Sequence, residues 1–181
     1  NNGALPWAEK ERNGTLVGRA SADSRYRNSN GGGSADPNRE INMKKAINDA
    51  GFTINDTLYN AYASSSTQRV KAGDTTADIG EEKIGFYTTE LRNSFAQHND
   101  AAIVTLSRWG GEGTDMSRND SEGVSQLALH PSERDLLQMI DDCGQFAKII
   151  VLINSVYPRQ LGDWGGTHVQ PGLWLAHPGY Y

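Results

Sequence analysis

The residues best suited to chemistry lie in a polar, glycine-rich segment, residues 107–116. Glu112 stands between two glycines, so no neighbouring side chain shields its carboxylate. Arg108 precedes it by four residues and Asp115 follows it by three, which brings charges of both signs close together. A carboxyl group in such surroundings can have a raised pKa and act as a general acid. The same composition also suits a solvated acidic loop, and the residue types alone leave both interpretations open.

A second glycine-rich segment, residues 31–34, ends in Ser34. It lacks the Gly-Lys-Ser/Thr ending of a phosphate-binding loop and the Gly-x-Gly-x-x-Gly spacing of a dinucleotide fold. Its glycines permit either a flexible turn or a close approach of the backbone to a ligand. The four histidines of the chain show no metal-ligand spacing. The sequence therefore predicts neither a metal site nor a cofactor.

The elements that must position these segments are indicated by apolar runs. Ala101–Leu106 and Lys148–Ile153 are nearly continuous runs, which predict strands covered on both faces of a sheet. Between them, Pro131–Cys143 begins with proline, has acids in its first turn and predicts a helix. Strand, long loop, helix and strand in this order are typical of a right-handed crossover in a parallel sheet. A shorter run at Thr15–Arg19 predicts a first strand, and Pro171–Ala176 is a third apolar segment.

These runs predict a three-layer α/β/α sandwich with a mostly parallel, doubly wound sheet. In such sheets ligands bind at loops that leave the carboxyl ends of strands, and both glycine-rich segments follow a predicted strand. The other expected elements are a helix from Ile41 that Gly51 ends, a short helix capped by Asn55 or Asp56, an exposed polar excursion at Ser64–Glu82, and an amphipathic helix at Phe86–His98.

The composition limits what the chain can bind. Its 181 residues suit one domain, and its net charge is −5 with acids and bases interspersed. No stripe of Lys and Arg could neutralise phosphates, so nucleic acid is not an expected partner. No apolar run approaches the ~20 residues that span a bilayer, so no membrane segment is expected. The single cysteine, Cys143, excludes an intramolecular disulfide and is expected to be a buried structural thiol. The compartment, cytoplasmic or secreted, stays open.

Almost the whole chain resembles the second domain of glycoside hydrolase family 3, the β-glucosidase-like enzymes. The motif around Glu112 is fairly specific, and the glycines before Ser34 only support it. The matching stretches are Asn2–Pro6, Val17-Gly18-Arg19, Gly31-Gly32-Gly33-Ser34, Ala102-Ile103-Val104, Ser107-Arg108-x-Gly110-Gly111-Glu112-Gly113-x-Asp115, Leu127–Ile140, Ile150-Val151-Leu152-Ile153-Asn154-Ser155 with Pro158, Leu173-Trp174 and Pro178-Gly179.

The resemblance implies half of a retaining β-glycosidase active site. By position Glu112 would be the general acid/base. Arg108 and Asp115 would shape its loop and, together with Ser34, bind the substrate, with Ser34 in contact with sugar. The nucleophilic Asp of this family belongs to an N-terminal (β/α)8 barrel, which would be the partner domain, with a β-linked oligosaccharide or glycoside as substrate. A retaining hydrolase needs its two carboxyl groups only ~5–5.5 Å apart, so the cleft between the domains would bind the substrate.

The resemblance also sets expectations for the limits of the chain. Residues 1–181 are expected to form one domain, with residues 1–13 as the linker from the barrel and with the C-terminal end of the domain truncated. Trp109 and His177 depart from the family pattern and are expected to serve packing. Two other functions stay open at this stage. One is a non-catalytic carbohydrate-binding or regulatory α/β module, and the other is a nucleotide- or phosphate-binding protein of flavodoxin-like shape.

Overall fold

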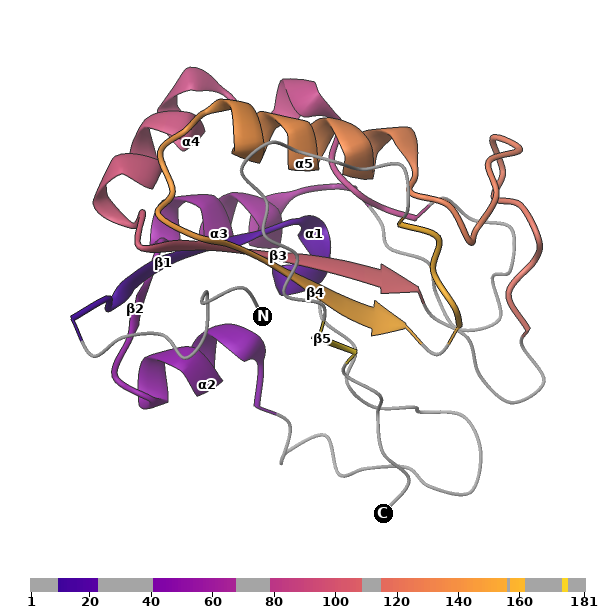
Figure 1. The fold of residues 1–181 in the computed structure, drawn as a ribbon. Coiled ribbons are helices and arrows are strands. Elements are labelled where there is room, and N and C mark those ends of the chain that lie inside the picture. Colours follow the sequence, from indigo (N-terminus) through magenta and orange to yellow (C-terminus); the bar gives the residue numbers. More distant parts are fainter. Residues whose placement is uncertain are drawn as a thin grey trace, which may run out of the picture.

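A computed structural model describes residues 10–22, 41–67, 79–108, 115–155, 157–161 and the backbone of 174–175. Within these residues five parallel strands form one sheet, in the spatial order β2-β1-β3-β4-β5 (Figure 1). The strands are β1 (Asn13–Val17), β2 (Thr53–Ile54), β3 (Ala101–Arg108), β4 (Ile149–Ser155) and β5 (Trp174–Leu175). All four pairings between neighbours are parallel, as the apolar runs predict.

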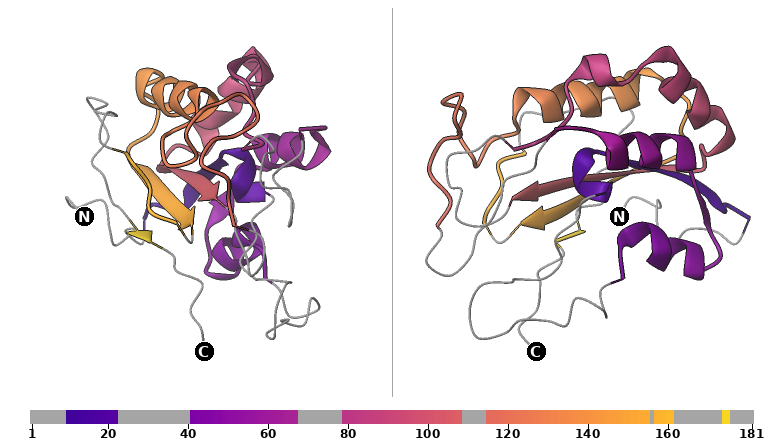
Figure 2. Two further views of the ribbon diagram at one scale, coloured as in Figure 1. Left: turned by 90° about the vertical axis from the view of Figure 1, so that its right-hand side faces the viewer. Right: turned by 180° about the vertical axis from the view of Figure 1, so that it is seen from behind.

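Helices cover both faces of this sheet, which confirms the predicted α/β/α sandwich. The helical elements are α1 (Arg19–Ala22), α2 (Met43–Asp49), α3 (Asp56–Ser64), the 3-10 turn η2 (Ile84–Phe86), α4 (Thr89–Asn93), the 3-10 turn η3 (Ser94–Gln97) and α5 (Pro131–Asp142). The views in Figures 1 and 2 place α3, α4 and α5 on one face and α2 on the other. No helix in the described part of the chain is long and apolar enough to cross a membrane.

The alternation of side chains along the central strands explains why their sequences read as unbroken apolar runs. In β3, Ala102, Val104 and Leu106 belong to the core beneath α3 and α5, whereas Ala101 and Ile103 belong to the core beneath α2. Strand β4 alternates in the same way between the two cores. Successive side chains of a strand point to opposite faces, so a strand between two helical layers must be apolar at both sets of positions.

Several predicted boundaries change in the structure. The first strand ends at Val17 rather than Arg19 because Gly18 takes a φ of +89°, which leaves the extended conformation. The helix expected at Phe86–His98 begins only at α4, where the hydroxyl of Thr88 caps it by accepting from the Leu91 amide, and it closes with the 3-10 turn η3. The very short elements β2 and α1 were not expected from the sequence.

The prediction for residues 64–82 is wrong at the C-terminal end of that segment. The segment Ser64–Glu82 was expected to be an exposed excursion, yet Ile79, Glu81 and Glu82 are buried. Glu81 accepts hydrogen bonds from the backbone amides of Arg19 and Glu82, and the Glu82 carboxylate accepts from the hydroxyls of Ser65 and Thr67. Buried carboxylates persist when hydrogen bonds replace their water, so a polar sequence here does not require exposure.

The end of β1 is packed closely against β3. A methyl group added at Gly18 would lie 3.0 Å from the backbone oxygen of Thr105 and 3.2 Å from Oε2 of Glu81. The amide of Gly18 donates to the hydroxyl of Tyr62 at 2.8 Å, and that hydroxyl is 2.9 Å from the hydroxyl of Tyr87. Burial raises the pKa of both phenols well above the ordinary value, so both stay neutral and hydrogen-bonded.

We expect Gly18→Ala to destabilise the chain more than Gly123→Ala. Both glycines have a positive φ, +89° and +83°, so each alanine is strained by about 1–2 kcal/mol. Only Gly18 has neighbours within contact distance, since nothing lies within 4 Å of the position of a Cβ at Gly123. Overpacking should therefore add about 1–3 kcal/mol at Gly18 alone. Urea unfolding of both variants measures the difference, and equal losses would contradict the close approach of β1 and β3.

Candidate active site

Arg108, one of the residues predicted for the site, lies at the carboxyl end of the sheet, where strand β3 ends. The strand order reverses between β1 and β3, which is the switch point where doubly wound sheets bind ligands outside the carboxyl ends of their strands. Strands β3 and β4 end in register, with Ser107 beside Asn154 and Arg108 beside Ser155. Figure 1 shows these strand ends at the same edge as the start of α5.

Arg108, the last residue of β3, is buried with only 2 % of its side chain exposed. Its guanidinium donates to both oxygens of the Glu133 carboxylate, at 2.6 and 2.8 Å. It also donates to three backbone carbonyls, those of Ser107 at 2.9 Å, Gln126 at 3.2 Å and Ala128 at 3.2 Å. A forked pair of this kind fixes the direction of both side chains as well as their distance.

Glu133 lies in the first turn of α5, and its side chain is 1 % exposed. Two hydrogen bonds among residues 130–133 cap the start of the helix. Nδ1 of His130 accepts from the amide of Ser132 at 3.2 Å, and the amide of His130 donates to the Glu133 carboxylate at 2.9 Å. This reciprocal arrangement is a capping box with histidine in the place of the usual Ser or Thr. The carboxylate therefore has two tasks, starting α5 and holding Arg108.

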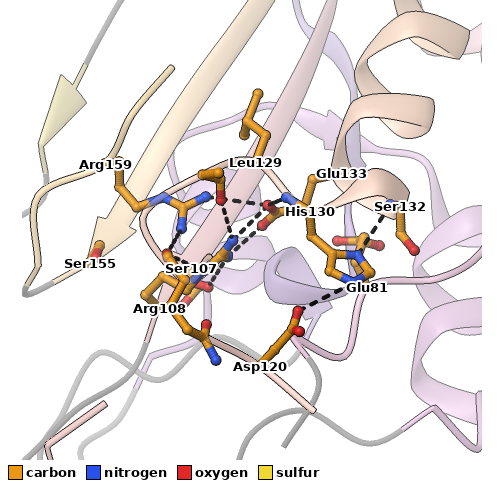
Figure 3. Close-up of polar contacts among 12 residues, drawn as sticks. Glu81, Ser107, Arg108, Asp120, Leu129, His130, Ser132, Glu133, Ser155 and Arg159 are labelled. Carbon is orange, nitrogen blue, oxygen red and sulfur yellow. Dashed lines mark hydrogen bonds and ion pairs between the residues drawn. The ribbon is translucent and has the colours of Figure 1, made fainter. Parts of the chain in front are cut away.

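A second arginine shares the same carboxylate. Arg159, in the segment after β4, donates to Glu133 at 3.3 Å and to the carbonyl of Gln126 at 2.6 Å. We call the set of Arg108, Glu133 and Arg159 the guanidinium clamp. Figure 3 shows both guanidinium groups turned toward the Glu133 carboxylate. The clamp joins the end of β3, the start of α5 and the segment that follows β4.

The charges of the guanidinium clamp decide the ionisation of its members. Burial opposes the charged form of Glu133, but Arg108 first and then Arg159 outweigh it, and the pKa of this carboxyl lies below its ordinary value. Burial, followed by the charge of Arg108, lowers the pKa of Arg159 to about 10, which leaves it cationic at neutral pH. Two buried guanidinium groups thus share one carboxylate.

His130 also links α5 to the turn that precedes it. Its Nε2 lies 3.5 Å from Oδ2 of Asp120 and 3.6 Å from Oε2 of Glu122. The other oxygen of Asp120 accepts from the amides of Glu122 at 3.0 Å and Val124 at 2.8 Å, which closes the turn on itself. Since Nδ1 of His130 accepts a hydrogen bond from α5, Nε2 is the ring nitrogen that faces these carboxylates. These contacts hold residues 120–124 of the connection between β3 and α5 against the start of that helix.

Two of the four predicted site residues lie among the described residues, and two do not. Arg108 is described and fully enclosed, and Asp115 is described and exposed on the same connection. Glu112 and Ser34 lie outside the described residues, as do Trp109 and His177. Segment 109–114, which contains Glu112, directly follows Arg108 at the carboxyl end of β3.

Three residues of the site were not singled out from the sequence. Glu133 was interpreted as an acid in the first turn of a helix, His130 was considered only as a histidine without metal-ligand spacing, and Arg159 was not interpreted at all. Cys143, expected to be buried, is half-buried at the end of α5, where its thiol donates to the carbonyl of Ile140 at 3.1 Å and burial raises its pKa. Among the described residues, no group of three or more His, Cys, Asp or Glu side chains is arranged to hold a metal ion.

This chain is similar to known proteins in its structure rather than in its sequence. No protein-family profile matches the chain, and no curated protein sequence matches it. Its structure, however, is similar to that of a β-glucosidase from Paenibacillus barengoltzii, with a TM-score of 0.67 and 20 % identity over 89 % of this chain. The chain has the fold of a β-glucosidase domain.

Two further structures extend this similarity. They are of β-glucosidase 3B from Thermotoga neapolitana, determined with glucose, and the TM-scores are 0.62 and 0.65 at 21 % and 24 % identity over 91 % of this chain. The chain spans only 17 % of the Paenibacillus enzyme and 23 % of the Thermotoga enzyme. The β-glucosidase-domain fold is thus one part of a much larger protein in these enzymes. This agrees with the fold that the sequence resemblance implies.

Proposed function

We propose that this chain is the acid/base-bearing domain of a retaining β-glycosidase of the β-glucosidase type. The observation that supports this most is the position of segment 109–114. It leaves the carboxyl end of β3, beside the switch point of the sheet, in a fold shared with β-glucosidases. Glu112 in that segment is the general acid/base, and terminal β-linked sugars are the substrate. The barrel domain of the same protein is the partner, and it supplies the nucleophile.

The reaction needs one proton to move in each of two steps. In the first, the nucleophilic carboxylate of the barrel attacks the anomeric carbon, the glycosidic bond breaks, and Glu112 gives its proton to the departing oxygen. In the second, the Glu112 carboxylate takes a proton from water as that water attacks the anomeric carbon and releases the nucleophile. The two carboxyl groups belong to different domains, so the cleft between the domains is the substrate site.

The other predicted residues have supporting parts in this proposal. Arg108 shapes the root of the Glu112 segment from inside the protein, because its guanidinium is enclosed and bound to Glu133. Asp115, directly after that segment in the sequence, is exposed and can act on the loop or the substrate. Ser34, in the sequence between α1 and α2, contacts sugar at the domain interface.

The isolated 181-residue chain should not hydrolyse an aryl β-glucoside, whereas the full-length protein should. Without the barrel there is no nucleophile to form the glycosyl-enzyme intermediate. A spectrophotometric assay of both proteins with a nitrophenyl β-glucoside measures this. Turnover by the pure chain that Glu112→Gln abolishes would show a complete site in the chain and overturn the division between domains.

A binding assay separates the proposal from a non-catalytic carbohydrate-binding module. Half of a site should bind glucose barely or not at all, because most of the contacts belong to the missing domain. A self-sufficient binding module should instead show saturable affinity for glucose or cellobiose in titration calorimetry of the isolated chain. Saturable binding, unchanged by Glu112→Gln, would favour the module.

A further inference from the structure

The Arg108 side chain has no donor left for a substrate. A guanidinium has five N–H groups. In this structure Nε donates to Gln126, Nη1 donates to Ser107 and Glu133, and Nη2 donates to Ala128 and Glu133. With 2 % of the side chain exposed, a sugar hydroxyl has neither an approach nor a partner here. Any effect of Arg108 on the reaction must therefore pass through the backbone of β3.

Glu133 decides whether Arg108 can hold this position. The buried guanidinium groups of Arg108 and Arg159 both contact one carboxylate, whose Oε2 accepts from Arg108, Arg159 and the amide of His130. Without the negative charge of Glu133, two cations would share a buried space, and repulsion would drive them apart. The orientation of Arg108 thus depends on Glu133 directly, and on Arg159 through the carboxylate and the carbonyl of Gln126 that both arginines use.

The segment beyond Arg108 needs such an anchor. Glu112 is four residues from Arg108, so its Cα lies at most about 14 Å from the Cα of Arg108. Glycines on either side of Glu112 give the backbone wide freedom. A displacement of about 1 Å at a reacting group can lower a rate on the order of 10²-fold, so the direction in which this segment leaves β3 matters.

We propose that Glu133 and Arg159 are positioning residues for the acid/base step, which fix through Arg108 the strand end that carries the Glu112 segment. The inference rests on the proposed function, in which Glu112 is the acid/base. Neither residue touches the substrate. Their contribution is to keep the root of the segment in one orientation, with α5 and the segment after β4 as its fixed supports.

The test uses three variants of the full-length protein that contains this chain. Glu133→Gln keeps the shape of the side chain and removes its charge. Arg159→Gln removes one of the two arginines and leaves the pair of Arg108 and Glu133 intact, so it serves if Glu133→Gln does not fold. Asp135→Asn is the matched control, because it removes a carboxylate from the exposed face of the same helix, two residues further on. Each variant is assayed on cellobiose and on a dinitrophenyl β-glucoside.

A positioning role predicts a loss that depends on the leaving group. Glu133→Gln should lower kcat on cellobiose on the order of 10²-fold, because protonation of the leaving oxygen needs a well-placed acid. On the dinitrophenyl glucoside, the rate constant of the pre-steady-state burst, which measures the first step, should change less than about twofold, since that leaving group departs without a proton. Arg159→Gln should show the same split with a smaller loss, and Asp135→Asn should match the wild type on both substrates.

The results separate this proposal from the one on which it rests. Equal losses on both substrates in Glu133→Gln and Arg159→Gln would show a general structural role, and no loss on either substrate would show that these residues do not affect the reaction. Either result would overturn the inference. If Glu112→Ala shows the leaving-group dependence in the same assay, the proposed function stands even then. If Glu112→Ala itself lacks that dependence, the proposed function fails, and the inference fails with it.

Discussion

Replacing Arg108 by methionine should lower the free energy of unfolding of this chain by about 3–5 kcal/mol at neutral pH. Arg108 and Glu133 are a fully buried, doubly hydrogen-bonded pair. Removing the guanidinium of Arg108 leaves the buried Glu133 carboxylate without two of its hydrogen bonds and without the nearest positive charge. Three backbone carbonyls would also lose a donor. Denaturant unfolding measures the loss. Arg118→Met, an exposed arginine in the same connection, is the control and should change stability by less than about 0.5 kcal/mol.

The pH dependence of this loss has a definite sign. The pKa of Glu133 is lower in the folded chain than its ordinary value of about 4.5. Its ionised form therefore stabilises the fold above that pH, and this contribution is lost as the pH falls through the folded pKa. The difference between wild type and Arg108→Met should narrow as the pH falls below that ordinary value toward the folded pKa. A difference that stays constant from pH 3 to pH 7 would contradict the ion pair as its origin.

The sequence was sufficient for the elements that are long and buried. Strands β3 and β4 were predicted because each is a nearly continuous apolar run, and helix α5 was predicted because its apolar positions repeat over enough residues to show a period. Strand β2 and helix α1 were missed because elements of 2 and 4 residues have no period to detect. The helix expected at Phe86–His98 was too long because the spacing of its apolar residues does not reveal that Thr88 is the cap.

The candidate site was only partly predictable, for a different reason. Arg108 was predicted to belong to the site because it lies four residues before Glu112 in the sequence. Its partner Glu133, however, is 25 residues away. A single sequence does not reveal which acid such an arginine will meet. Glu133 had a sufficient local explanation as an acid in the first turn of a helix, and this explanation concealed its long-range contacts. Arg159 comes 26 residues after Glu133 and showed no local pattern.

The second large effect is expected at Glu112 in the full-length protein. Glu112→Ala should lower the hydrolysis of cellobiose by about 10²- to 10⁴-fold, because protonation of a poor leaving group dominates that barrier. The first step on a dinitrophenyl glucoside should be spared. The second step would lack its base, so the glycosyl-enzyme should accumulate and give a burst of dinitrophenol. Glu90→Ala, an exposed carboxylate on α4, is the control and should leave both substrates unaffected.

Azide tests the role of Glu112 most directly. As an anionic nucleophile it needs no base, so it can attack the accumulated glycosyl-enzyme of Glu112→Ala where water cannot. Steady-state turnover of the dinitrophenyl glucoside with and without azide is the decisive measurement, with the product identified by NMR. The account predicts that azide restores turnover and yields the β-glycosyl azide. Equal losses for good and poor leaving groups, with no response to azide, would contradict it.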